Sequence, residues 1–274
     1  MAAFHSRSNS FPSSHPSIED VEAQLCRLRS SEATSTSASS VCANLANLGS
    51  LHESIKDLIQ MSSIQQVLSH QQGQNQINEL LEGSIKLVDL CEFSREALCL
   101  TKESVQDLES AIRRNKGESI DISSYIASRN KIKKMIHKYI KNLKSCTGLD
   151  SDLKPVGTML KEAEGIDFSV LKSVLILLSG ERERSNGKSW SFLSKFNKTS
   201  QVHSERAKQE SGVEDLCSLN IHQSQKKIDN ITMQNMLKQL KATELIVQEL
   251  EEGVEALFRS LVKTRVSLLN MISH

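Results

Sequence analysis

The chain has 274 residues, enough for one large domain or two small ones, and its formal net charge is +1 at pH 7. So small a net charge gives no overall attraction to nucleic acid, and any electrostatic role must come from local patches. Hydrophobic residues make up 38% of the chain but aromatic residues only 4%, which favours a core of Leu, Ile and Val between helices over a β-sandwich or barrel.

The first 16 residues, MAAFHSRSNSFPSSHP, are polar, rich in Ser and interrupted by two prolines, so we expect a disordered arm. Within it, Arg7, Ser10 and Pro12 form the pattern R-S-x-S-x-P, which resembles the phosphoserine motif that 14-3-3 proteins bind. A phosphate on Ser10 would present oxygens to an Arg cluster, while Pro12 turns the chain away. An unmodified Ser-rich tail is the alternative, because matches this short arise by chance. A short organelle transit peptide in residues 1–18 also stays open.

Amphipathic helices are predicted from residue 17 onward. Ser17 and Asp20 form a capping-box-like start, and the Ser- and Thr-rich stretch 30–40 predicts a connector or a capping segment. The apolar period predicts helices over residues 17–29, 39–60 and 64–69, followed by a Gln-rich link at 71–74.

The longest amphipathic stretch covers residues 75–115 and predicts one helix about 60 Å long. Its apolar residues recur at steps of three and four and share one side of the helix: Ile77, Leu80, Leu81, Leu87, Val88, Cys91, Leu98, Val105, Leu108 and Ile112. Propensity alone does not keep an isolated helix of this kind ordered, so other helices must cover its apolar stripe.

A helix over residues 121–146 is predicted to carry a basic face. Four lysines lie opposite its apolar arc: Lys131, Lys134, Lys138 and Lys141. No acidic residue occurs in residues 122–149, and Arg129 stands among the apolar positions. A basic face without acids one turn away repels itself, so it implies a counter-charge supplied from elsewhere.

Two further helices are predicted over residues 154–164 and 167–179, separated by Gly165. The second is apolar almost all round, and we expect it to be buried on several sides or to seat in a partner.

Residues 180–212 are polar, basic and long, which predicts a disordered linker. Trp190, Phe192 and Phe196 lie beside lysines in this segment, as in an interfacial membrane or partner motif. The alternative is a weakly ordered loop whose aromatic side chains dock on the bundle.

The last segment, residues 213–274, contains a heptad pattern typical of a coiled-coil-like seam. Its two series are Met233, Leu240, Val247, Val254, Leu261 and Leu268, and Met236, Leu250, Leu257 and Met271, with Thr243 and Thr264 in the gaps. Further apolar residues widen the seam: Leu245, Ile246, Phe258, Val262, Val266 and Leu269. We therefore expect this helix to pack into a bundle, with a homo-oligomer through the seam as an alternative.

The six cysteines are widely spaced and form no C-x-x-C pair, which predicts reduced cysteines, mostly in the core, and a cytosolic compartment. Because no hydrophobic run reaches the roughly 18 residues needed to cross a bilayer, any contact with an anionic membrane would be peripheral.

Motifs for nucleotide binding, metal hydrolysis and acyl transfer are missing from the sequence, and its eight histidines form no short ligand pair. We therefore predict that the protein is not an enzyme and has no cofactor or metal site. The alternative is an enzyme or small-molecule handler with a pocket inside the bundle, lined by Ser84, Ser94 and Thr101, which interrupt the apolar stripe of the longest helix. Ordinary tolerance of small polar groups in a helix seam also accounts for these three residues.

Five stretches of the chain resemble the plant-specific BYPASS family: FHSRSNSFPSSHP, VEAQLCRLRSSEATSTSASS, NELLEGSIKLVDLCEFSREAL, SRNKIKKMIHKYIKNLK and LEEGVEALFRSLVKTRVSLLNMISH. The resemblance spans nearly the whole chain. It implies a role in root and shoot development, and one branch of the family is linked to restraint of a mobile root-to-shoot signal. The family has no established catalytic activity, so the resemblance implies no catalytic residue.

Together these patterns predict an all-α fold, an elongated multi-helix bundle with coiled-coil-like long helices. We expect a disordered arm at residues 1–16, a helical bundle at 17–179, a flexible basic linker at 180–212 and a long helix within 213–274 that packs on the bundle. The expected function is non-enzymatic regulation of plant development through protein partners or a membrane surface.

Overall fold

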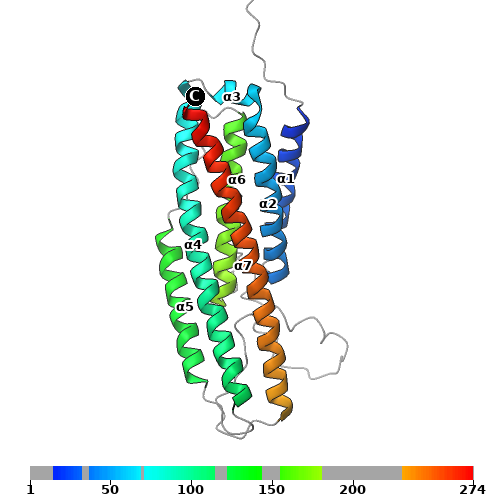
Figure 1. Ribbon diagram of the computed structural model, residues 1–274, viewed down its shortest axis with the longest axis vertical. Helices are drawn as coiled ribbons and strands as arrows, with labels where there is room; N and C mark the ends of the chain where they lie inside the picture. The colour runs from blue at the N-terminus through cyan, green and yellow to red at the C-terminus, as the bar shows by residue number, and fades with distance from the viewer. Residues whose placement is uncertain are drawn as a thin grey trace, which may run out of the picture.

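A computed structural model of the protein describes residues 15–32, 37–68, 71–114, 122–143, 155–180 and 230–273. Within these residues it contains seven α-helices and no β-strand, which confirms the predicted all-α class. The helices are α1 (Pro16–Glu32), α2 (Ala38–Gln60), α3 (Ser62–Leu68), α4 (Gln71–Arg114), α5 (Ser123–Asn142), α6 (Pro155–Ser179) and α7 (Asn230–Ser273). They form one elongated bundle, in which α4 and α7 run along most of the length and α3 lies across one end (Figure 1).

The apolar stripe of α4 is covered by its neighbours, as the sequence requires. α4 packs against α3, α5, α6 and α7, while α7 lies against both α2 and α4, and α1 packs on α2 and α6. Every residue of the predicted α4 stripe is buried except Val88, which is half-buried. The core therefore follows α4 along its length, and helices from both halves of the chain close it.

Two predicted element boundaries were wrong. Residues 71–74 belong to α4 rather than to a link, and α6 runs through Gly165 without a break. Gly165 is exposed, and a Cβ at this position would meet nothing within 4 Å. A helical glycine costs about 1 kcal/mol. Burial of Ala163 and Ile166 on either side outweighs that cost, because each buried apolar side chain contributes about as much or more.

The Ser-rich stretch between α1 and α2 acts partly as a cap. α1 continues to Glu32, and α2 begins after Ser37, whose Oγ accepts a hydrogen bond from the backbone N–H of Ser40 at 3.2 Å. This is the hydrogen bond by which an N-cap serine satisfies one of the open N–H groups at the start of a helix.

The heptad seam of α7 faces the inside of the bundle. Its buried positions are Met236, Leu240, Val247, Leu250, Val254, Leu257, Leu261 and Leu268. Among the residues that widen the seam, Leu245, Val262, Val266 and Leu269 are exposed, because α2 and α4 cover only part of the circumference of α7.

Three glycines allow close approach between helices. A methyl group at Gly83 of α4 would overlap the Glu164 carboxylate of α6, and one at Gly157 of α6 would lie 2.7 Å from Gln76 Oε1 of α4. A methyl at Gly253 of α7 would lie 3.0 Å from Cδ1 of Leu45. α4 thus has a glycine where α6 places Glu164, and α6 has a glycine where α4 places Gln76.

We expect Gly83→Ala to lower the free energy of unfolding by about 1–3 kcal/mol, because the buried Glu164 carboxylate must move to admit a methyl group. Gly165→Ala is the matched control in a helix and should raise it by about 0.5–1 kcal/mol, since only backbone entropy changes. Urea unfolding followed by circular dichroism measures both. Equal changes in the free energy of unfolding for the two substitutions would show that the close approach at Gly83 does not affect stability.

Candidate functional site

The predicted basic face lies on α5 at the edge of the bundle. Lys131, Lys134, Lys138 and Lys141 are all exposed, and none pairs with a carboxylate of the residues that the structure describes. From Lys131 to Lys141 they span eleven residues of helix, or about 15 Å along its axis. On the opposite side of α5, Tyr125, Ile132 and Ile136 are buried. The counter-charge that the sequence predicts for this face is thus not provided by the described part of the bundle.

Ring stacking and an arginine fix the orientation of α5 on α4 and α6. The rings of Tyr139 on α5 and Phe93 on α4 stack with centroids 3.7 Å apart. Arg129, which interrupts the apolar arc in the sequence, donates from Nη2 to the Leu178 carbonyl at 2.6 Å and from Nη1 to Thr101 Oγ1 at 3.3 Å. The Leu178 carbonyl lies in the last turn of α6, where a positive charge is favourable. Arg129 therefore positions the helix that carries the lysines.

Two groups of predicted site residues lie outside the described residues. They are Arg7, Ser10 and Pro12 of the 14-3-3-like motif, and Trp190, Phe192 and Phe196 of the aromatic cluster. Both assignments stay predictions.

The polar interruptions of the α4 stripe mostly bond within their own helix. Ser94 Oγ donates to the Leu90 carbonyl and Thr101 Oγ1 to the Ala97 carbonyl, both at 2.7 Å. Ser84 Oγ donates to the Leu81 carbonyl at 2.7 Å, and it alone of the three lines the cavity described below. Small hydroxyl groups that bond back to the preceding turn need no ligand to be satisfied.

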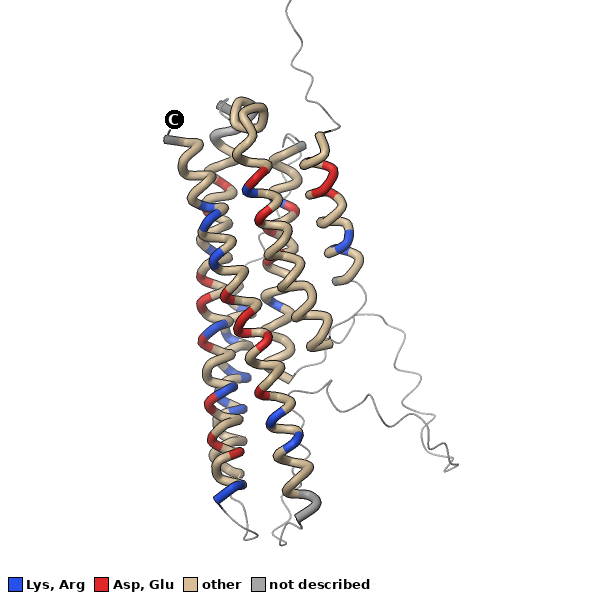
Figure 2. The backbone as a smooth tube through the Cα atoms, turned by 45° about the vertical axis from the view of Figure 1, so that its right-hand side comes forward, with Lys and Arg blue, Asp and Glu red and all other residues tan. Residues whose placement is uncertain are grey.

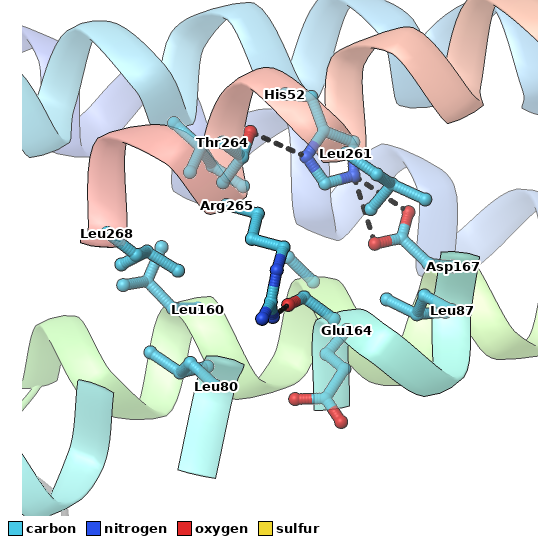
Figure 3. A pocket seen from close by; sticks show the side chains of 13 residues that line it. His52, Leu80, Leu87, Leu160, Glu164, Asp167, Leu261, Thr264, Arg265 and Leu268 are labelled. Carbon is cyan, nitrogen blue, oxygen red and sulfur yellow. Dashed lines mark hydrogen bonds and ion pairs between the residues drawn. The ribbon is translucent and has the colours of Figure 1, made fainter. Parts of the chain in front are cut away.

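A buried polar cluster, which the sequence did not predict, joins α2, α6 and α7 (Figure 3). His52 and Asp167 are only 4% and 1% exposed. His52 Nε2 lies 2.9 and 3.1 Å from the two carboxylate oxygens of Asp167, and its Nδ1 lies 3.4 Å from Thr264 Oγ1. Because an ionised carboxylate only accepts hydrogen bonds, the His52 proton nearest to Asp167 must be on Nε2.

Glu164 and Arg265 extend this cluster toward α4. Glu164 is 5% exposed, and its two carboxylate oxygens accept hydrogen bonds from Lys161 Nζ at 3.0 and 3.2 Å. Arg265 Nη1 donates to the Leu81 carbonyl at 2.5 Å and to Ser84 Oγ at 2.6 Å, so it ties α7 to α4. Burial raises the pKa of Glu164, with a further upward contribution from the nearby Asp167, while Lys161 partly opposes the increase.

A cavity of about 40 Å³ lies among His52, Ser84, Glu164, Asp167, Thr264 and Arg265, and its other walls are aliphatic side chains, mostly leucines (Figure 3). Since a single water needs roughly 10–15 Å³ of such space, the cavity has room for about three waters. Within the described ranges, no group of three or more His, Cys, Asp and Glu residues has the arrangement of a metal site.

The order hydroxyl, imidazole and carboxylate is that of a hydrolytic triad, but the surroundings do not complete one. Acyl transfer also requires N–H donors aimed at a developing oxyanion. Thr264 lies inside α7, where the helix uses the backbone N–H groups, and Arg265 Nη1 donates to Leu81 and Ser84 of α4. The arrangement fits a polar link between helices better than a reaction centre.

The sequence does contain a pattern that could have pointed to this cluster, namely polar residues at core positions of two helices. His52 follows Leu48 by four residues and precedes Ile55 by three, so it occupies a core position of the α2 stripe. Asp167 stands in the same way between Ala163 and Val170 on α6. A charged group at a core position requires a buried partner, but the sequence does not show which helix supplies it.

The cysteines of the described residues form no disulfide. Cys42 and Cys91 are buried as predicted, whereas Cys26 and Cys99 are exposed. Burial raises the pKa of Cys42 to about 11, with Glu249 adding to the increase, and burial also raises that of Cys91. Both buried thiols are therefore protonated and poorly nucleophilic at neutral pH.

These features define an all-helical bundle with a polar link in its core and a surface row of lysines that pair with no carboxylate in the described part of the chain. The family model described as Protein BPS1 matches residues 44–271, so the chain belongs to this family, and its resemblance to the plant BYPASS family is confirmed. Membership suggests a role in plant development. Comparison with curated proteins and with solved structures gave no match. Among the described helices, none combines the length and hydropathy that a membrane span requires.

We expect His52→Ala to lower the free energy of unfolding by about 3–5 kcal/mol, because it leaves the buried Asp167 carboxylate without its hydrogen-bond donor. Thr264→Val keeps the shape of the side chain and removes one long hydrogen bond, so its cost should be about 1 kcal/mol or less. Urea unfolding measures both. The His52–Asp167 contact would be unimportant if His52→Ala cost no more than Thr264→Val.

The raised pKa of Glu164 predicts a dependence of stability on pH. The native state retains the Glu164 proton to higher pH than the unfolded chain does, so this group lowers stability as pH rises from the ordinary value of 4.5 through the raised folded value. Glu164→Gln should remove that decrease. Urea unfolding of both proteins at a series of pH values above about 4 tests this. Parallel stability curves would contradict it.

Proposed function

We propose that this protein is a non-enzymatic helical interaction protein that regulates root and shoot development, and that the basic face of α5 is its contact surface. Family membership supports the developmental part of the proposal. The observation that carries the contact surface is the row of four exposed lysines on α5, none paired with a described carboxylate. The proposal places the protein in the cytosol, where it binds acidic protein partners or lies against an anionic membrane.

The chemistry of the basic face fits a reversible electrostatic contact. The large exposed hydrophobic side chains of the described residues lie on α4 and α7, so α5 offers charge without an apolar surface to insert. Each lysine near an anionic membrane contributes about 1 kcal/mol, which makes about 4 kcal/mol for the four. Contact of this strength is weak, fast and sensitive to salt.

The alternative, an enzyme or small-molecule handler that affects a mobile developmental signal, would use the buried polar cluster. The cavity there is about 40 Å³. Pockets for metabolites usually enclose roughly 300 Å³ or more. The basic face therefore has the stronger support as the working surface of the protein.

Replacing Lys131, Lys134, Lys138 and Lys141 with Gln should reduce binding to vesicles containing phosphatidylserine, or to the acidic partner, by at least about tenfold. Co-sedimentation with vesicles and proximity labelling in plant cells measure the two kinds of contact. Binding to vesicles should weaken as the salt concentration of the assay increases, because exposed charges are screened.

A control variant removes the same amount of charge elsewhere. Its four exposed lysines lie on α4, α6 and α7: Lys86, Lys172, Lys238 and Lys241. This variant should retain binding, and circular dichroism should show equal helicity in both. Equal loss of binding in the two variants would mean that only net charge matters and would contradict a specific role for α5.

A further inference from the structure

An exposed apolar strip follows the outer boundary between α4 and α7. Its members, between 37% and 49% exposed, are Ile85 on α4 and Val262, Val266 and Leu269 on α7. Ile85 follows Ser84, and Val266 follows Arg265; because Arg265 donates to Ser84 Oγ, the two parts of the strip lie at the same level of the bundle. Large apolar side chains gathered on one face typically mark a contact surface.

The same boundary is polar along the rest of its length. α4 and α7 run antiparallel, and their outer edges are joined by Gln106 with Glu244, Lys102 with Glu251 and Arg95 with Glu255 at 2.7–3.1 Å. Beyond Arg95, Arg265 of α7 reaches inward across this boundary to Leu81 and Ser84 of α4. The strip therefore begins where the row of charged contacts ends.

Charges of opposite sign line the two sides of the strip. On the α4 side, Asp89 and Glu92 are exposed; on the α7 side, Arg259 and Lys263 are exposed. All four lie between the Arg95–Glu255 and Ser84–Arg265 contacts, hence at similar levels along the bundle. The strip thus has exposed acidic side chains on its α4 side and exposed basic side chains on its α7 side.

We propose that this strip binds a second copy of the chain, with a two-fold axis parallel to the long axis of the bundle. Such an axis lies in the plane of the interface. It swaps the two sides of the strip between the copies and keeps each residue at the same height along the bundle. It places the acidic side of each copy against the basic side of the other, and the apolar centres against each other. A two-fold axis across the bundle would instead place acid against acid.

The opposite charges on the two sides of the strip explain why a second copy fits this surface better than another apolar segment would. A partner with a uniformly charged rim would meet like charge on one side, whereas a copy of the chain meets opposite charge on both. Arg259 and Lys263 have partners in their own chain, Glu255 at 3.1 Å and Glu53 at 3.3 Å. Exposed pairs of this kind are weak, so they can be exchanged or shared when the copies meet.

The strip is a different surface from the basic face, because its apolar members lie on α4 and α7 and the four lysines lie on α5. Pairing through the strip also differs from pairing through the heptad seam, because most side chains of the seam are buried within one copy.

Sedimentation equilibrium of the full chain tests the proposal. The wild type should show a monomer–dimer equilibrium within protein concentrations up to about 100 μM. Val262→Gln with Val266→Gln should weaken dimerisation by at least about tenfold, because polar groups replace the apolar centre. Leu245→Gln is the control on the same helix; Leu245 is 57% exposed but lies outside the strip, so dimerisation should be unchanged. A wild type that stays monomeric, or a strip variant that dimerises normally, overturns the proposal.

Reversal of the two rims tests the orientation. Asp89→Lys with Glu92→Lys, and separately Arg259→Glu with Lys263→Glu, should each abolish dimerisation, since like charges then face each other. A mixture of these two variants should recover a mixed dimer, because each reversed rim meets its opposite in the other variant. Thermal unfolding by circular dichroism verifies that each variant is folded. Reversed variants that dimerise alone, or folded variants that fail to pair in the mixture, overturn this arrangement.

Discussion

The antiparallel contact between α4 and α7 is the constraint on which the rest of the bundle depends. Each helix has 44 residues and an apolar stripe along its length, and neither would stay ordered in water by itself. When α4 and α7 pack together, each covers only part of the apolar stripe of the other, and one side of each stripe stays exposed to water. α2 covers that side of α7, while α6 and α5 cover that of α4. The architecture thus follows from hiding two long stripes with the shorter helices available.

Apolar stripes alone leave the relative level of the helices poorly determined, because a heptad pattern looks similar after a slide of seven residues. We infer that the polar contacts remove this ambiguity. His52 meets Asp167, Arg265 meets Ser84, and the Glu164 carboxylate occupies the space left by Gly83. If one helix slid by a heptad relative to its neighbour, buried charges would lose their partners, which costs roughly 3–5 kcal/mol. The cluster therefore selects one arrangement among several that would bury similar apolar area.

The surface shows how a chain with almost no net charge still carries distinct faces. Basic and acidic segments occur on several helices along the bundle (Figure 2). On α5 the lysines are concentrated because the sequence has no acid between residues 121 and 150. Along the α4–α7 boundary both signs occur, and Arg95 with Glu255 and Lys102 with Glu251 form ion pairs across it. An electrostatic contact surface and a self-complementary one can thus coexist on different parts of one bundle.

The sequence by itself determined the helical class, the long central helix and the apolar stripes, because these depend on spacing within one segment. It also located the basic face, since Lys131 to Lys141 share one side of a single helix. Only the tertiary structure decided what lies opposite each residue. The pairing of His52 with Asp167 joins residues 115 positions apart, and Gly165 remains helical because its neighbours are buried. The exposure of Val262 and Val266 likewise depends on how much of α7 its two neighbours cover. Periodicity states which side of a helix is apolar, but which helix covers that side is a property of the assembled bundle.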